Sequence, residues 1–185
     1  AGYFLFETAA MLLFIFSRKK HILRKNLTRV LKDVSPSSSM LKNAYKTYAR
    51  YYFDLFQKRE TIVKNIDGSK FTPYESKIKS LLENKKGVII TSMHAGNWDA
   101  GGAFLSSCFP GKINVIVEEL SAPVFRWFSE TRNKWGFNII RSTDIKKMLR
   151  ALNKGEILVL AADRDLEKNG YKIDFFGKKA HIPSG

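Results

Sequence analysis

Short apolar runs alternate with segments of helical spacing from residue 74 to the end of the sequence. The apolar runs predict strands at residues 87–93, 113–119, 137–141 and 156–162. Helical spacing predicts helices at residues 75–84, 97–108, 122–135 and 143–153, and glycines follow the last two as stop signals. Strands and helices that alternate in this way predict an α/β fold with a mostly parallel sheet flanked by helices.

Further elements are predicted on either side of this alternation. Residues 40–59 are rich in Tyr, Phe and Leu and predict an amphipathic helix, which a turn at residues 34–39 precedes and could cap. Residues 171–185 predict a strand, a turn at Gly177 and Lys178, and a second strand.

Charged side chains follow each of the four predicted strands. Because the carboxyl ends of parallel strands meet at one edge of a sheet, sites in such folds form there. The residues at these ends are His94, Glu118 and Glu119, Arg141, and Asp163 with Arg164. The sequence does not decide between Glu118 and Glu119. We expect the functional site at this edge.

His94 carries the clearest chemistry of these candidates. It follows the strand at residues 87–93, and Gly96 favours an open turn into the next helix. An imidazole titrates near neutral pH, so it can act as a general base when an anion orients its ring. Asp99, five residues later, is the expected anion. The alternative is a solvated histidine at the sheet edge, with Asp99 as an ordinary acid of a first helical turn.

Composition limits the class of partner. The 185 residues suit one domain, and 44% apolar with 13% aromatic residues exclude a disordered chain. With 32 Lys and Arg against 17 Asp and Glu, the net charge of +15 favours nucleic acid, acidic lipid headgroups or an acidic carrier protein. The single cysteine, Cys108, forbids an internal disulfide and lies in no metal-like spacing. We interpret Cys108 as a small buried apolar residue.

The first sixteen residues are apolar except for Glu7 and Thr8, and a basic segment at residues 17–29 follows them. Sixteen residues are fewer than the roughly 20 that a helix needs to cross a bilayer. The basic segment follows the apolar one, which is the reverse of the order in a signal peptide. We expect either a truncated membrane helix or a helix that lies in the membrane interface, with the basic segment on anionic headgroups. A core helix with a solvated charge run is the alternative.

Four blocks of the sequence together resemble one family. They are HAGNWD, VIVEELSAPVFRWFSETRNKWGFNIIRS, KGEILVLAADRD and DFFGKKAHIPSG, in this order. Over residues 24–185 the chain resembles the bacterial lipid A late acyltransferases and the related phosphatidylinositol mannoside acyltransferases. Asp99 and the triplet Asp163-Arg164-Asp165 look closer to the mannoside branch.

The resemblance implies a glycerolipid-acyltransferase-like fold at the cytoplasmic face of the inner membrane. The implied reaction moves a fatty acyl chain from a thioester, of coenzyme A or of acyl carrier protein, to a hydroxyl of a lipid A precursor or of a phosphatidylinositol mannoside. No cofactor or metal is implied, and no nucleic-acid partner. We expect a membrane-attachment segment at residues 1–30 and an acyltransferase domain at residues 31–185. The family domain extends further, so we also expect that its C-terminal portion is missing here.

The resemblance also assigns roles to individual residues. His94 and Asp99 form the HX4D motif, in which His94 matches the general base and Asp99 its orienting partner. Residues that match substrate-contacting positions near the site are Arg132, Glu118 or Glu119, Asp163 and Arg164. A phosphate of the headgroup or of the donor's phosphopantetheine is the expected ligand of Arg132 and Arg164.

Elementary chemistry defines the step that this site would perform. Neutral His94 would take the proton of the acceptor hydroxyl as its oxygen attacks the thioester, and backbone N–H groups at Gly96 and Asn97 would stabilise the oxyanion. A covalent acyl-enzyme is not expected, because no G-x-S-x-G elbow is present. A hydrolase or thioesterase on the same scaffold, an inactive homologue and a basic nucleic-acid-binding protein are the alternatives.

Overall fold

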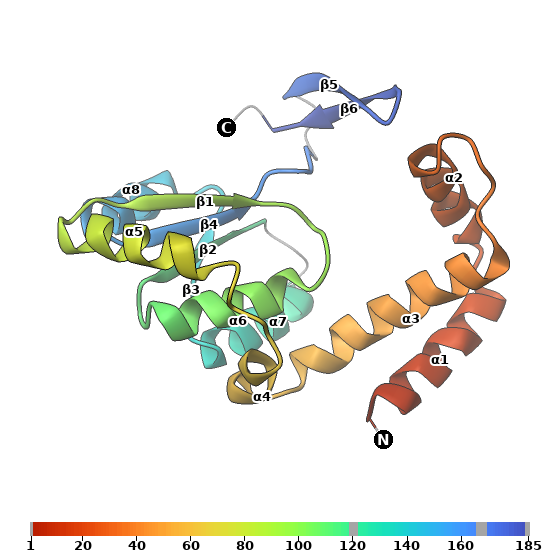
Figure 1. Cartoon of the computed structure of the whole chain (residues 1–185), viewed down its shortest axis with the longest axis horizontal. Coiled ribbons are helices and arrows are strands. Elements are labelled where there is room, and N and C mark those ends of the chain that lie inside the picture. The colour runs from red at the N-terminus through yellow and green to blue at the C-terminus, as the bar shows by residue number, and fades with distance from the viewer. Residues whose placement is uncertain (1, 119–121, 166–169, 184–185) are drawn as a thin grey trace. The chain divides into compact units, whose positions relative to one another are not determined.

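The chain divides into two compact units. The computed structural model describes residues 2–118, 122–165 and 170–183. Residues 1–56 together with residues 167–185 form the first unit, and residues 57–166 form the second (Figure 1). The predicted division into residues 1–30 and 31–185 follows function rather than contacts, and it stays a prediction.

A four-stranded parallel sheet forms the centre of the second unit. Its order is β1-β4-β2-β3, and every neighbouring pair is parallel. The strands are β1 (Val88–Ser92), β2 (Ile113–Val117), β3 (Asn138–Arg141) and β4 (Ile157–Ala161). Each strand lies within its predicted range. The prediction of an α/β fold with a mostly parallel sheet flanked by helices is therefore confirmed.

In the described part of the second unit, five helices accompany this sheet. They are α4 (Arg59–Lys64), α5 (Thr72–Glu83), α6 (Trp98–Cys108), α7 (Ala122–Lys134) and α8 (Ile145–Asn153). Helices α6 and α7 lie together on one side of the sheet (Figure 1). The connection through α8 runs back along the sheet order, and because parallel crossovers are right-handed, α8 covers the opposite face. The separate helix α4 is not predicted from the sequence.

The core of the second unit is packed from the strands and the small residues of α6. Ile113 and Ile157 on neighbouring strands are fully buried. A Cβ atom on Gly102 would come within 2.7 Å of the Phe137 ring, so this position requires glycine for the close approach of α6. Ser106, also buried, donates its hydroxyl to the Trp135 carbonyl at 2.6 Å. This packing fixes α6, which begins directly after the His94 loop.

Within its described residues, the first unit contains three helices and a hairpin. The elements are α1 (Gly2–Phe16), α2 (Lys20–Val30), α3 (Ser38–Leu55), β5 (Tyr171–Phe175) and β6 (Lys178–Ile182). The Ser37 side chain caps α3 by accepting from the Met40 amide at 3.2 Å. The two turn residues of the hairpin, Phe176 and Gly177, have φ of 48° and 68°, as a type I′ turn requires.

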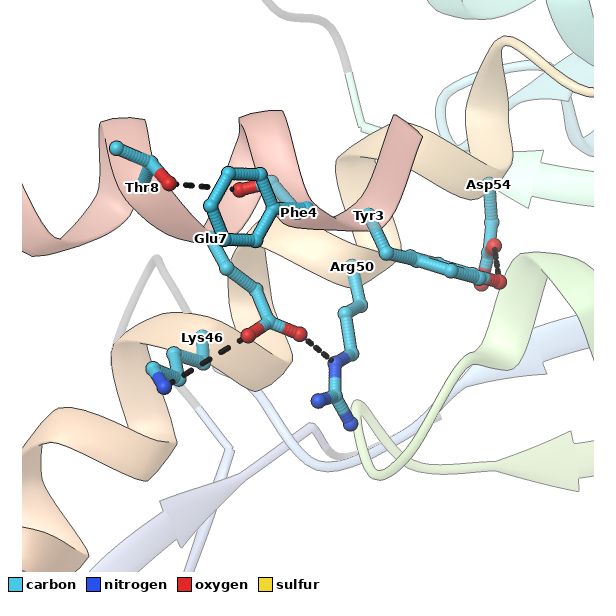
Figure 2. A network of polar contacts seen from close by, with 7 residues as sticks. All are labelled: Tyr3, Phe4, Glu7, Thr8, Lys46, Arg50 and Asp54. Atoms are coloured by element: carbon cyan, nitrogen blue, oxygen red, sulfur yellow. Dashed lines mark hydrogen bonds and ion pairs between the residues drawn. The ribbon is translucent and has the colours of Figure 1, made fainter. Parts of the chain in front are cut away.

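Two polar residues of α1, Tyr3 and Glu7, face α3 (Figure 2). The Glu7 carboxylate accepts from Arg50 at 2.6 Å and lies 3.7 Å from the Lys46 ammonium. Tyr3 donates its hydroxyl to Asp54 at 2.6 Å. Aromatic contacts join the same two helices, with the rings of Phe6 and Phe53 5.3 Å apart. The interruption of the apolar N-terminal run by Glu7 therefore has a structural role between two helices.

The outward side of α1 is apolar and exposed. The exposed side chains include Phe4, Leu5, Leu12, Leu13, Ile15 and Phe16. Among the helices that the structure describes, none combines the length and the apolar character needed to cross a membrane. The expected N-terminal attachment helix therefore stays a prediction.

Candidate active site

The His94 loop joins β1 to α6 through a tight turn. Strand β1 ends at Ser92, and Gly96 has a φ of 63°, which a residue without a Cβ adopts at no steric cost. The Asn97 side chain accepts from the Ala100 amide at 2.9 Å and so caps α6. This loop holds His94 at the carboxyl edge of the sheet. The ring of Trp98, the first residue of α6, lies edge-on to the His94 ring with 5.0 Å between centroids.

Strand pairing brings Asp163 to His94. Strands β1 and β4 are neighbours, and Ser92 lies opposite Ala161 in their register. Two residues beyond this pair, His94 Nδ1 and the Asp163 carboxylate form a hydrogen bond of 2.8 Å. Both side chains are about one-third exposed. A substrate can therefore reach the pair, and the paired strands β1 and β4 hold the two residues in place.

The charge state of Asp163 fixes the tautomer of His94. Burial raises the pKa of the Asp163 carboxyl, but hydrogen bonds from the His94 ring and from the backbone amides of His94 and Asp163 outweigh burial, so the pKa lies below its ordinary value of 3.8. Near neutral pH the carboxylate is ionised and can only accept, so Nδ1 carries the hydrogen and donates it. In a neutral ring, Nε2 then keeps its lone pair. Within the described ranges Nε2 has no hydrogen bond.

Asp99 is held by Arg132. Arg132 Nε donates to Asp99 Oδ1 at 2.7 Å, and Nη2 donates to Oδ2 at 3.2 Å. The Asp99 side chain is 3% exposed and that of Arg132 is 15% exposed. The Phe128 ring lies 5.1 Å from the guanidinium carbon and covers it. This bidentate pair ties the first turn of α6 to the last turn of α7.

The structure therefore differs from the expectation that Asp99 orients His94. Trp98 and Asp99 are consecutive helical residues, so their side chains point in different directions. Trp98 faces the His94 ring, while the Asp99 carboxylate is engaged by Arg132. The carboxylate on His94 Nδ1 belongs to Asp163, which the sequence places near the site without this role. Phe128 is not predicted at all, although its i, i+4 spacing from Arg132 is a usable signal.

Neither a metal-binding group nor a reactive thiol is found among the described residues. Among them, no group of three or more His, Cys, Asp and Glu side chains could hold a metal ion. Burial, and to a lesser extent the charge of Glu75, raises the pKa of the Cys108 thiol, which makes it a poor nucleophile. An oriented histidine is the group in this geometry that can move a proton near neutral pH.

Sequence comparison now identifies the family. A sequence model described as "Bacterial lipid A biosynthesis acyltransferase" matches residues 1–185. The chain belongs to the bacterial lipid A biosynthesis acyltransferase family. The predicted resemblance is confirmed.

The chain is also similar to curated proteins with a different name, phosphatidylinositol mannoside acyltransferase. The chain is 26% identical over 171 residues to a phosphatidylinositol mannoside acyltransferase of Mycolicibacterium smegmatis, a match that covers 88% of this chain and 56% of the relative. It is 25% identical over 176 residues to proteins of the same name from two strains of Mycobacterium tuberculosis, covering 88% of this chain and 54% of each relative. The chain thus spans about half the length of these relatives.

Other residues predicted at the carboxyl ends of the strands lie at the same edge of the sheet. Glu118 follows β2 and is exposed, and Arg164 follows Asp163 and is also exposed. Arg141 ends β3, with its guanidinium 5.5 Å from the Phe125 ring. Glu119 lies outside the described residues. Roles of Glu118, Glu119, Asp163, Arg164 and Arg132 in substrate binding stay predictions.

The lowered pKa of Asp163 predicts that the stability of the fold depends on pH. A carboxyl whose pKa is lower in the folded state stabilises the fold above its unfolded pKa, and this contribution is lost as pH falls through the folded value. We expect Asp163→Asn to lower the free energy of unfolding at pH 6, and the difference from wild type to shrink below pH 3.8. Urea unfolding at several pH values measures it. A difference that stays constant over this range would show that the Asp163 charge does not contribute.

Proposed function

We propose that this chain carries the catalytic base of an acyltransferase that moves a fatty acyl chain from a thioester to a hydroxyl of a glycolipid. The acceptor is a phosphatidylinositol mannoside or a lipid A precursor, and the donor is a thioester of coenzyme A or of acyl carrier protein. The observation that carries the proposal is the His94–Asp163 hydrogen bond at the carboxyl edge of the sheet. The family membership and the names of the relatives support the reaction class.

His94 performs the proton transfer in the proposed reaction. Asp163 holds Nδ1–H, so Nε2 is the atom that takes the proton of the acceptor hydroxyl as its oxygen attacks the thioester carbonyl. The Asp163 carboxylate stabilises the imidazolium that forms. When the tetrahedral intermediate collapses, the C–S bond breaks, and Nε2 returns the proton to the departing thiolate. The products are an ester and a free thiol, and the base is regenerated.

The turn beside His94 supplies a donor for the developing oxyanion. Within the described ranges, the Gly96 amide makes no hydrogen bond, and a Cβ atom at Gly96 would meet no atom within 4 Å. A backbone N–H without a hydrogen-bond partner, directly before a helix start, suits an anion. The buried Asp99–Arg132 pair then has a positioning role, because it anchors the start of α6 directly after this turn.

The proposed acceptor is a membrane lipid, so the protein is proposed to act at the cytoplasmic face of the inner membrane. The exposed apolar side of α1 and the basic segment after it support attachment at a membrane interface. Glu7 and Tyr3 support the same proposal, because their polar groups are directed to α3 and are not on that exposed side.

The Asp163→Asn variant tests the proposed mechanism. An amide at position 163 can donate a hydrogen bond to Nδ1 and so favours the tautomer with its lone pair on the wrong nitrogen. We expect kcat to fall about 10- to 100-fold with little change in KM, because the substrate is still bound. Transfer from a labelled acyl thioester to each glycolipid acceptor, followed by mass spectrometry of the products, measures this. Glu83→Gln on α5 is the control for loss of one carboxylate elsewhere.

The product distribution separates this proposal from its alternatives. Acylated glycolipid supports transfer, whereas free fatty acid with no acylated acceptor would identify a thioesterase. Normal kcat in Asp163→Asn would remove Asp163 from the mechanism.

A further inference from the structure

A hollow of about 490 Å³ in the first unit is lined by basic side chains. Arg24, Lys25 and Arg29 line it from α2, and Lys178 lines it from β6. Asp33 is the one carboxylate among the lining residues, which also include His21 and Thr28. We call this feature the basic hollow. Its net charge is strongly positive, and it shares no residue with the candidate active site.

The segment between Glu7 and Asp33 concentrates positive charge and has no acidic residue to balance it. Between Glu7 and Asp33 there are seven Lys and Arg residues and no Asp or Glu. Lys25 and Arg29 lie one turn apart on the same face of α2, because residues four apart are neighbours on a helix, and Arg24 lines the same hollow. In the part of the chain that the structure describes, none of these three side chains forms an ion pair within 4.0 Å. Their charges are therefore available to an external anion.

Exposed apolar residues adjoin both segments that line the basic hollow. Ile15 and Phe16 come directly before the basic segment and are 60% and 79% exposed. Phe175 ends β5 and Phe176 lies in the turn before Lys178, and they are 57% and 50% exposed. Phe176 adopts a positive φ, which is unusual for a bulky residue, so its position at the hairpin tip is not explained by backbone preference. An occupant should therefore combine an anionic group with apolar chains.

From these observations we infer that the basic hollow binds the phosphodiester of an anionic phospholipid in the membrane surface. Guanidinium groups offer paired donors to phosphate oxygens, and the neighbouring exposed apolar residues suit the acyl region below the headgroup. Nucleic acid or an acidic carrier protein would use the charge but would leave these apolar residues without a partner. The inference rests on the proposed membrane attachment but not on the acyl-transfer chemistry.

Vesicle binding by the double variant Arg24→Gln/Arg29→Gln tests this inference. The probes are phosphatidylcholine vesicles with and without phosphatidylglycerol, and the bound fraction is measured by sedimentation. We expect the partition coefficient on the anionic vesicles to fall about 10- to 30-fold, since each basic residue near such a surface contributes roughly fivefold. The control Lys86→Gln/Lys112→Gln removes the same charge from exposed positions of the second unit and should remain within about twofold of wild type.

A variant that removes a negative charge from the basic hollow gives a second test, with an effect in the opposite direction. Asp33 has a φ of 67°, a conformation that asparagine also tolerates, so Asp33→Asn removes charge without changing the backbone preference. We expect it to bind the anionic vesicles about fivefold more tightly, with Glu83→Gln unchanged as its control. Folding of each variant is checked by circular dichroism.

Three outcomes would overturn the inference. The control pair could lose as much binding as Arg24→Gln/Arg29→Gln, which would indicate attraction by net charge alone. Soluble glycerol phosphate could displace the protein from vesicles at low concentration, which would indicate a site for free phosphate. The double variant could bind vesicles normally while KM for an acyl carrier protein thioester rises, which would assign the basic hollow to a protein partner. Vesicle binding needs no acyl donor, so absence of acyl transfer would contradict the proposed function alone.

Discussion

Replacement of His94 by alanine is expected to lower the rate of acyl transfer by about 10²- to 10⁴-fold, the range for loss of a general base. The acceptor hydroxyl is a weak nucleophile near neutral pH, and no second base accompanies Nε2 among the contacts described for this site. The effect should fall on kcat, because the ring is proposed to act in the transition state and not to hold the substrate. Steady-state kinetics with a labelled thioester and saturating acceptor measure this.

Chemical rescue distinguishes a lost base from a damaged fold. The His94 side chain is one-third exposed, so its removal leaves an open space that added imidazole can enter. We expect imidazole to restore part of the activity in His94→Ala and to have no effect on Asp163→Asn, which keeps its own ring. Thermal unfolding of His94→Ala should remain cooperative, with a loss of stability similar to that of Asp163→Asn, because both variants lose the same hydrogen bond. A fully active His94→Ala variant would remove His94 from the reaction.

The helices and strands of the second unit could be predicted because local sequence signals mark where each of them begins and ends. Apolar runs define the strands, and glycines at 136 and 155, with φ of 89° and 68°, stop the helices before β3 and β4. The predicted helix at residues 40–59 shows where such signals fail. The end of α3 at Leu55 is not marked by glycine or proline, so the predicted helix extends to residue 59, and α4, which begins there, is missed.

The pairing inside the candidate site could be predicted only in part. Local sequence places His94, Asp163 and Glu118 at the same edge of the sheet, since all follow parallel strands. Which of them meet depends on strand order, and β1 lies beside β4 although two strands and three helices separate them along the chain. The short spacing from His94 to Asp99 favours a contact that the start of α6 does not permit. Non-local register, set by the whole sheet, decides the partner.

Loss of the buried ion pair between Asp99 and Arg132 is the second change with a large expected effect, in this case on the stability of the fold. Arg132→Met leaves the Asp99 carboxylate buried without its partner, which costs about 3–5 kcal/mol in free energy of unfolding. Asp99→Asn keeps the shape and one acceptor, so we expect about 1–3 kcal/mol. Because both changes break the same pair, the double variant should lose less than the sum, by about 1–3 kcal/mol. Urea unfolding of the four proteins gives this coupling energy directly.

An exposed ion pair supplies the matched control for this cycle. Lys79 and Glu75 lie four residues apart on α5 at 2.6 Å, and the Lys79 side chain is 54% exposed. Water and salt screen such a pair, so Lys79→Met should change the free energy of unfolding by less than about 1 kcal/mol. The two ion pairs have similar N–O distances, so a difference between their effects on the free energy of unfolding is caused by burial. Additive effects of Asp99→Asn and Arg132→Met would show that the pair does not anchor α6 to α7, and the positioning role proposed for it beside the His94 turn would then be lost.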